Sequence, residues 1–173
     1  RRGRRGIRVY DPACGSGGMF VQSAKFVEDH KGNINNISVF GQESNPTTWK
    51  MAQMNLAIRG IEANLGDYNA DTFMNDRFPT EKFDYIMANP PFNVDEVSFD
   101  RVSGDARFNT YGVPRNSTKS AKKASDKKET VPNANYLWIG YFATALNEHG
   151  KAALVMANSA SDAGKSEYEI RKK

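Results

Sequence analysis

Short apolar runs and longer stretches with a helical apolar face follow one another along the chain. The runs of strand length predict strands at 7–11, 37–43, 63–66, 83–88 and 151–157. The stretches of helix length predict helices at 19–30, 46–59 and 134–148. Residues 93–133 are polar with little periodicity, and they predict a loop of about forty residues.

This succession of elements predicts an α/β fold, a doubly wound, Rossmann-like sandwich with a mainly parallel sheet of five strands. Ligands of such sheets bind beyond the carboxyl ends of the strands. Two polar turns stand at such ends, YDPACGSGG at 10–18 and ANPPF at 88–92. We therefore expect the two turns to contribute to one site.

Composition narrows the class of protein. The 173 residues fit one domain, and 39% hydrophobic with 25% charged residues is typical of a soluble globular protein. No apolar run approaches the ~20 residues of a membrane helix, and no signal-peptide pattern is seen. Cys14 is the only cysteine, which excludes an intrachain disulfide and favours the cytoplasm. Because no histidine lies near it in sequence, Cys14 is expected to be a buried thiol rather than a nucleophile. We expect no metal site.

The net charge of +4 comes from two basic segments. Residues 1–8 carry five arginines and no acid, and residues 115–128 carry a local charge of +5, which leaves −6 on the rest. The basic tail at 1–6 and the basic part of the 93–133 loop either contact phosphate backbones or are simply solvated.

The glycine turn after the first strand suits a nucleotide-like ligand. Gly15, Gly17 and Gly18 allow positive φ and a close approach of ligand to backbone, next to the free amides of a helix start. Phe20 breaks the dinucleotide pattern G-x-G-x-x-G, and the P-loop sequence is absent; a tight turn without a ligand is the other interpretation. Glu43, 26 residues after Gly17, can accept both hydroxyls of a ribose or be solvated. Together these residues favour an adenosine-containing cofactor without a pyrophosphate.

The second turn, Asn89-Pro90-Pro91-Phe92, suits an exocyclic aromatic amine. The side-chain oxygen of Asn89 and the carbonyl of Pro90 can accept its two N–H groups and aim the nitrogen lone pair at a methyl sulfonium. Successive prolines stiffen the turn, and Phe92 offers a flat face for stacking. A base within duplex DNA would have to be flipped out to reach this turn. The alternative is that the two prolines only end a buried strand.

The motifs DPACGSGGMF, GQES, NADTF and NPPF, in this order, resemble the N6-adenine DNA methyltransferases. The resemblance is greatest to the modification subunit of type I restriction–modification systems. It covers nearly all of residues 7–173 and is weakest across 98–130. It implies an S-adenosyl-L-methionine-dependent, site-specific DNA adenine methyltransferase that works with DNA, a specificity subunit and a restriction subunit.

The resemblance also implies roles for individual residues. The S-adenosyl-L-methionine site would be formed by Asp11, Pro12, Ala13, Gly15, Ser16, Gly17 and Gly18, with Glu43 on the ribose and Asp71 and Thr72 near the cofactor adenine. The catalytic turn that grips and stacks the target adenine would be Asn89, Pro90, Pro91 and Phe92.

Parts of the family pattern are missing from this sequence. It lacks the upstream Phe-x-Thr-Pro-type element, strands beyond the fifth and a target-recognition domain. The first residue is not Met, and the final SEYEIRKK resembles a helix without a stop signal. We therefore interpret residues 1–173 as a partial catalytic domain, inactive by itself.

Two other functions stay open. A methyltransferase for another planar nitrogen, in a protein glutamine or an RNA base, would also use an Asn-Pro-Pro-aromatic turn, but Pro12 and the GSGGMF continuation favour DNA. A nucleic-acid-binding module without chemistry would use the basic loop alone. Where the protein acts on DNA, we expect the 93–133 loop to lie over the DNA and to order only on the complex. Its lysines should then give salt-dependent affinity without base readout.

Overall fold

The computed structural model describes residues 6–92, 94, 97–114, 130–131, 134–156, 158 and 165–173. These residues form two compact units. The first comprises the described residues up to Pro90 together with Leu146–Val155, and the second those of Pro91–Ala145 and Met156–Lys173. The expectation that residues 1–173 act as one domain stays a prediction. Within the described part of the chain, no helix combines the length and apolar character needed to cross a membrane.

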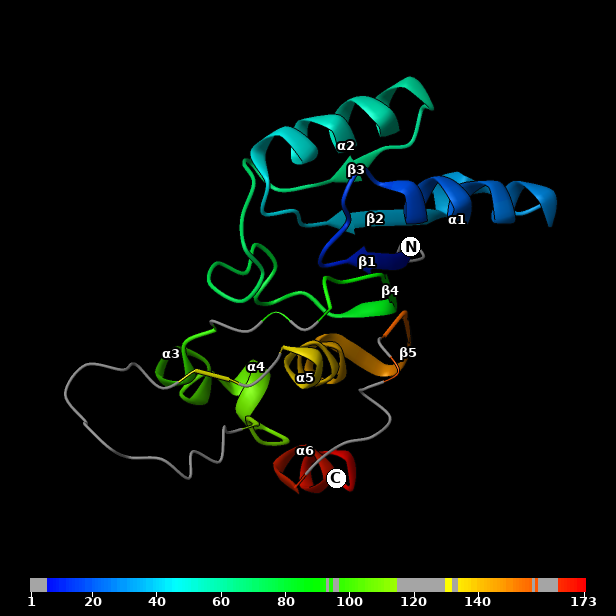
Figure 1. Ribbon diagram of the computed structural model, residues 1–173. Coiled ribbons are helices and arrows are strands. Elements are labelled where there is room, and N and C mark those ends of the chain that lie inside the picture. The colour runs from blue at the N-terminus through cyan, green and yellow to red at the C-terminus, as the bar shows by residue number, and fades with distance from the viewer. Residues whose placement is uncertain are drawn as a thin grey trace. The chain divides into compact units, whose positions relative to one another are not determined.

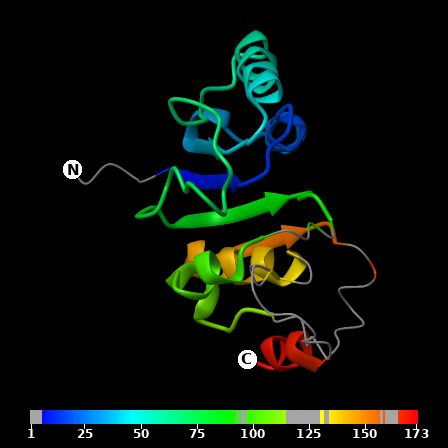
Figure 2. The same ribbon diagram turned by 60° about the vertical axis from the view of Figure 1, so that its left-hand side comes forward.

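The first unit contains a five-stranded sheet in the order β3-β2-β1-β4-β5 (Figure 1). Its strands are β1 (Ile7–Asp11), β2 (Ile37–Gly41), β3 (Ala63–Asn64), β4 (Phe83–Ala88) and β5 (Leu146–Leu154). Every neighbouring pair is parallel, and the arrows of β1, β4 and β5 accordingly point the same way in Figure 2. The predicted parallel α/β sheet is confirmed. All polar turns that follow these strands therefore leave the same edge of the sheet.

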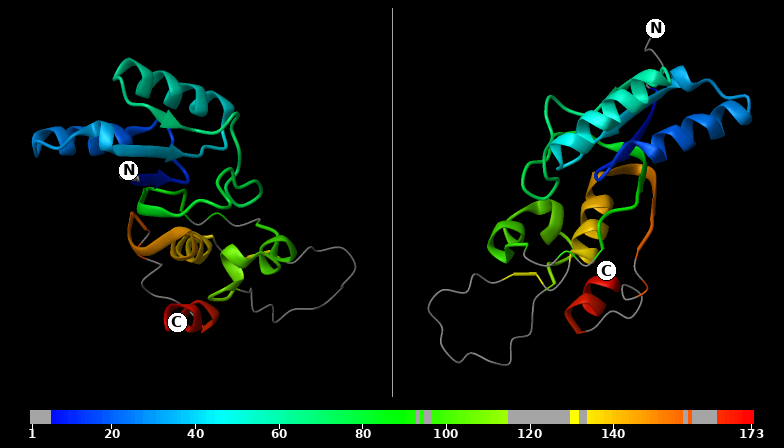
Figure 3. Two further views of the ribbon diagram at one scale, coloured as in Figure 1. Left: turned by 180° about the vertical axis from the view of Figure 1, so that it is seen from behind. Right: turned by 45° about the horizontal axis from the view of Figure 1, so that its top comes forward.

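Two helices lie side by side on one face of this sheet (Figure 3). They are α1 (Gly18–Asp29) and α2 (Pro46–Ile58), and a short 3-10 helix, η1 (Ile34–Asn36), follows α1. The two helices bury Phe20 and Leu56 in one cluster with Val9 and Val39 of the strands. Each side chain of that size contributes about 1.5–3 kcal/mol to folding by leaving water.

Local sequence explains where α2 begins. The Asn45 side chain accepts hydrogen bonds from the amides of Thr47 and Thr48, both at 3.0 Å. Pro46, whose φ is already helical and which has no N–H to satisfy, occupies the first turn. The predicted start of this helix is thus confirmed.

An aromatic cluster covers the other face of the strands. The rings of Tyr10 and Phe83 stack with centroids 4.3 Å apart, and Phe78 meets the Tyr10 ring edge-on. The guanidinium of Arg8 lies 4.9 Å above the ring of Phe40. It also forms an ion pair with Glu81, which fixes the segment that leads into β4.

The predicted helix at 134–148 and the predicted strand at 151–157 differ most from the observed elements, and the remaining boundaries differ by one or two residues. The predicted helix at 134–148 ends early, because α5 spans Asn135–Ala145 and β5 starts directly after it. Phe83 pairs with Leu146 but Tyr85 pairs with Lys151, so residues 147–150 stand opposite Asp84 alone. The side-chain amide of Asn147 donates to the Asp84 carboxylate within this bulge. The polar stretch Asn147–Gly150, which predicted a helix end, is therefore an irregular part of the strand.

The prediction of a loop over residues 93–133 is wrong for part of that range. Helices α3 (Phe99–Ser103) and α4 (Ala106–Asn109) form within it, and Phe99, Val102 and Phe108 are buried in the second unit. An amphipathic period this short carries too little signal to predict a helix. The predicted basic stretch at 115–128 and the basic tail through Arg5 lie outside the described residues.

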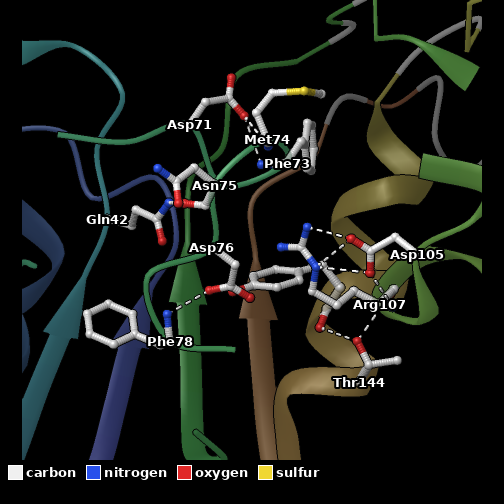
Figure 4. Close-up of polar contacts among 11 residues, drawn as sticks. Gln42, Asp71, Phe73, Met74, Asn75, Asp76, Phe78, Asp105, Arg107 and Thr144 are labelled. Atoms are coloured by element: carbon white, nitrogen blue, oxygen red, sulfur yellow. Dashed lines mark hydrogen bonds and ion pairs between the residues drawn. The ribbon is translucent and has the colours of Figure 1, made fainter. Parts of the chain in front are cut away.

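An arginine holds α4 and α5 of the second unit together. Arg107 binds the Asp105 carboxylate through Nε and Nη2, at 3.0 and 2.7 Å from Oδ2, and its carbonyl accepts a bond from the Thr144 hydroxyl of α5 at 3.1 Å (Figure 4). Its guanidinium also lies over the rings of Phe108 and Tyr141. The last helix of the unit is α6 (Lys165–Arg171), where the sequence predicted a helix.

Arg8→Met should destabilise the protein by about 1–3 kcal/mol, because it leaves Glu81 and the Lys82 carbonyl without their charged donor while the side-chain stem still packs on the aromatic rings. Urea unfolding would measure this difference. The matched control is Arg59→Met, whose exposed guanidinium bonds only within its own helix among the contacts described. Equal destabilisation by the two variants would contradict this role of Arg8.

Candidate functional site

The glycine turn joins β1 to α1 in a conformation that favours glycine. Gly15 has φ 55° and Gly17, the N-cap of α1, has φ 81°. A side chain at Gly17 would lie 3.3 Å from Leu56, whereas one at Gly15 would meet nothing within 4 Å. The space beside Gly15 is therefore open to a ligand, and the Gly17 side of the turn is closed by α2.

Backbone hydrogen bonds fix this turn to the end of β2. The Gln42 amide donates to the Asp11 carbonyl at 3.0 Å, and the Cys14 amide donates to the Gln42 carbonyl at 2.9 Å. The Glu43 carboxylate then accepts from the Gly15 amide through Oε2 at 3.0 Å and from the Asn45 amide through Oε1 at 2.8 Å. Glu43, the residue predicted to bind the ribose, thus lies directly against the glycine turn. Its Oε1 also accepts a long bond from the exposed Ser44 hydroxyl at 3.4 Å. Oε2 therefore keeps one acceptor position, and a ligand hydroxyl could take the place of Ser44 on Oε1.

The segment after β3 closes a third side. The Ala70 amide donates to the Glu43 carbonyl at 2.8 Å, and the Thr72 hydroxyl donates to the Pro12 carbonyl at 2.5 Å. Thr72 is buried, so this hydroxyl supports the glycine turn from behind. Residues of all three predicted cofactor motifs are therefore in direct contact.

Asp71 is exposed at the rim of these contacts. Its Oδ1 accepts from the amides of Phe73 and Met74, at 2.8 and 3.1 Å, which caps the turn that follows. The other carboxylate oxygen points away from the turn (Figure 4). Asp71 can therefore accept a hydrogen bond from a ligand while it keeps its own loop in place.

Asp11 is the buried acid of the site, with 1% of its surface exposed. Burial raises its pKa to about 7; the Ala13 amide, which donates to Oδ1 at 2.9 Å, opposes this shift and the Glu43 charge adds to it. Burial, together with the charges of Asp11 and Glu43, also raises the pKa of the Cys14 thiol far above its usual range. The prediction that Cys14 is a buried thiol is confirmed.

The Asn-Pro-Pro-Phe turn follows β4, the strand next to β1. Tyr10 pairs with Ile86, so Asp11 and Asn89 both leave the same edge of the sheet, from strands about 4.8 Å apart. Asn89 is exposed and Pro90 is buried. Pro91 and Phe92 belong to the second unit, and Phe92 is 42% exposed there.

The structure thus places ten of the predicted residues in the glycine turn after β1, at the end of β2 and in the segment after β3, three parts of the chain that hydrogen bonds join together. The ten residues are Asp11, Pro12, Ala13, Gly15, Ser16, Gly17, Gly18, Glu43, Asp71 and Thr72. Sequence reasoning missed Gln42, whose buried amide bonds to several parts of the site. The sequence signals were a polar residue at the end of a predicted buried strand, next to Glu43, and its place in the GQES motif.

Asp11→Asn should change how stability depends on pH. In the wild type the folded state keeps the Asp11 proton up to about pH 7, whereas the unfolded chain loses it near pH 3.8. The contribution of Asp11 to the free energy of unfolding is therefore greatest at low pH and is lost as the pH rises to 7. We expect the free energy of unfolding of the wild type, relative to Asp11→Asn, to fall between these values by up to about 1.4 kcal/mol per pH unit. Urea unfolding across this range measures the slope. Parallel curves for the two proteins would contradict the assignment.

Known proteins are similar to this chain in sequence. The chain is 46% identical over 166 residues to the type I restriction enzyme HindI methylase subunit of Haemophilus influenzae, covering 95% of this chain and 34% of the relative. It is 41% identical over 172 residues to the MjaIX methylase subunit of Methanocaldococcus jannaschii, covering 97% and 28%. The chain therefore spans about a third of the length of these relatives.

A solved structure shows the same arrangement. The type I restriction–modification system methyltransferase subunit from Streptococcus thermophilus matches with a TM-score of 0.75 and 25% identity, over 98% of this chain and 33% of that one. The model of the N-6 DNA methylase family matches residues 3–173. This chain belongs to the N-6 DNA methylase family.

Proposed function

We propose that this chain forms the catalytic core of a site-specific DNA methyltransferase that acts on the N6 nitrogen of adenine with S-adenosyl-L-methionine as methyl donor. One observation carries the proposal. The glycine turn, Glu43 and the Asp71 segment are hydrogen-bonded into one framework beside β1, and the Asn-Pro-Pro-Phe turn follows the adjacent parallel strand. Membership of the N-6 DNA methylase family supports the choice of adenine in DNA over a protein glutamine or an RNA base.

The residues of the first unit fit the cofactor. The open space beside Gly15 admits a ligand to the backbone, and Asp11, Pro12, Ala13, Ser16, Gly17 and Gly18 shape that turn. Glu43 can accept a bond from one ribose hydroxyl on Oε2 and from the other on Oε1 in place of the Ser44 hydroxyl. Asp71, supported by the Thr72 segment, can accept a bond from the adenine amino group. Glu43, together with Asp11 once a nearby cation favours its ionised form, also favours a cationic ligand over a phosphate, which agrees with a sulfonium compound. When bound, S-adenosyl-L-methionine supplies the electrophilic methyl group.

The Asn-Pro-Pro-Phe turn provides the acceptor side. An exposed Asn89 side-chain oxygen and the Pro90 carbonyl can accept the two N–H groups of an adenine amine. That pair of bonds draws the nitrogen toward tetrahedral geometry and exposes its lone pair. Pro90 and Pro91 each fix φ, so little entropy is lost when the base binds. Phe92, with its ring partly exposed, would stack against the base, which must be flipped out of the duplex.

The partners follow from the same proposal. DNA is the substrate, and a specificity subunit and a restriction subunit would complete a type I enzyme, as the names of the relatives suggest. The basic segments outside the described residues would add affinity for the phosphate backbone, independent of sequence. Such an enzyme would act in the cytoplasm. We expect the 173-residue chain by itself to show no methyl transfer to DNA.

Calorimetric titration with S-adenosylhomocysteine tests the cofactor site, and NAD serves as the negative ligand. Gly15→Ala and Gly60→Ala form a matched pair, because both glycines have positive φ, 55° and 66°, and open space where the side chain would go. Each should lower the free energy of unfolding by about 1–2 kcal/mol. Only Gly15→Ala should also weaken S-adenosylhomocysteine binding, by about tenfold or more. Equal affinity of the two variants would refute the placement of the ligand.

Asn89→Ala tests the acceptor side. The segment of the Haemophilus influenzae methylase subunit that this chain matches is replaced by this chain, with and without the substitution, and labelled methyl transfer to DNA is measured with the partner subunits present. The rate should fall by about 10²–10³-fold, because one preorganised hydrogen-bond acceptor is lost. DNA association, followed by fluorescence anisotropy, should change little. If association fell as much as the rate, Asn89 would be a DNA-binding residue instead.

A further inference from the structure

Gln42 lies where the glycine turn and the Asp71 segment meet. It follows the last residue of β2, precedes Glu43 and is only 1% exposed. Its backbone amide and carbonyl are bonded to Asp11 and Cys14 of the glycine turn. Its main chain is therefore fixed to the part of the site that would hold the methyl-donor end of the cofactor.

The side chain of Gln42 points to the other half of the site. Its Nε2 donates to the Ala70 carbonyl at 3.2 Å. It also donates to the carbonyl of Asn75 at 2.8 Å, and Gln42 and Asn75 are both drawn in Figure 4. Its Oε1 accepts from the Arg77 amide at 3.1 Å and, more weakly, from the Tyr10 hydroxyl at 3.5 Å. Both donors and both acceptor positions of the amide are in use. A buried amide satisfied in this way admits one orientation, because any rotation would break several bonds.

The segment that Gln42 holds has no regular secondary structure of its own. Residues 65–82 contain no helix or strand, and within them Asp71 caps the turn at Phe73 and Met74. The two carbonyls that Gln42 binds, at residues 70 and 75, bracket this turn. The Ala70 and Thr72 bonds already join this segment to Glu43 and Pro12. The Gln42 side-chain amide adds the bonds on both sides of the Asp71 turn that set where the Asp71 carboxylate stands.

We propose that Gln42 is a positioning residue that sets affinity for the nucleoside part of the cofactor by fixing the distance between Asp71 and the glycine turn. It does so without touching the ligand. The inference rests on the proposed function, since it assumes that Asp71 receives the cofactor adenine. A side chain with a merely structural role would alter stability but would not act through Asp71.

Gln42→Met tests the proposal, because methionine keeps the length and volume of the side chain and removes its hydrogen bonds. Gln53→Met, at an exposed position on α2, is the matched control. We expect S-adenosylhomocysteine to bind about ten- to hundredfold more weakly to Gln42→Met, as for other small misplacements of positioning groups, and to bind Gln53→Met as it does the wild type. Unchanged affinity in a folded Gln42→Met would overturn the proposal.

Two double-mutant cycles separate positioning from general destabilisation. In an Asp71→Ala background, Gln42→Met should have little further effect on affinity, because the group that Gln42 positions is already gone. In a Gly15→Ala background its full effect should remain, since Gly15 belongs to the other half of the site. Equal, additive effects in both backgrounds would show that Gln42 acts only on stability.

Hydrogen exchange of the wild-type protein tests the same idea if Gln42→Met does not fold. Binding of S-adenosylhomocysteine should slow exchange of the Arg77 amide, which donates to Gln42, together with the Phe73 and Met74 amides, which donate to Asp71. Slower exchange at Gly15 alone would overturn the role of Gln42 and leave the proposed function standing. Failure of the wild type to bind S-adenosylhomocysteine at all would overturn the proposed function itself.

Discussion

Parallel pairing of β1 with β2 on one side and β4 on the other is the constraint on which this site depends. Parallel strands end at the same edge, so the chain must leave that edge through turns whose backbone groups no longer have sheet partners. Some of these groups bond to the neighbouring turn, as Cys14 does to Gln42 and Gln42 to Asp11. The same bonds that satisfy the backbone bring the glycine turn and Glu43 together, so the site is a direct product of how the sheet ends.

Electrostatics gives this edge a preference for cations. Asp11 is buried and Glu43 lies close to it, and both effects hold the Asp11 carboxyl in its neutral form up to about pH 7. A positively charged group placed nearby would reverse that balance and favour the ionised carboxylate. Without a ligand, the ionised form of Asp11 is thus poorly stabilised. A cationic ligand such as the proposed sulfonium compound would stabilise this ionised form. A phosphate would instead place its negative charge beside Glu43, which fits the absence of dinucleotide and P-loop patterns from the turn.

What the sequence predicted well is what short-range chemistry determines. Glycines with positive φ at 15 and 17, the Asn45-Pro46 helix start and the β-branched and aromatic runs of the strands each carry their own local signal. Gln42 could not be assigned, because its partners at 70, 75 and 77 come together only when β2 and β3 are paired. Helices α3 and α4 were missed for a related reason: each is too short for a helical period, and Phe99 and Phe108 are buried by tertiary contacts. The bulge in β5 depends on the bond between Asn147 and Asp84, residues 63 positions apart.

One of the two compact units contains all the residues proposed to contact the cofactor. Asn89 and Pro90 belong to the unit that contains the glycine turn, Glu43 and Asp71, whereas Pro91 and Phe92 belong to the other. Every residue proposed to contact the cofactor therefore lies within one unit and is fixed there by its own hydrogen bonds. The groups proposed to accept the hydrogen bonds of the target amine, the Asn89 side chain and the Pro90 carbonyl, belong to the same unit. The hydrogen bonds that shape the cofactor side of the proposed site are consequently all internal to the first unit.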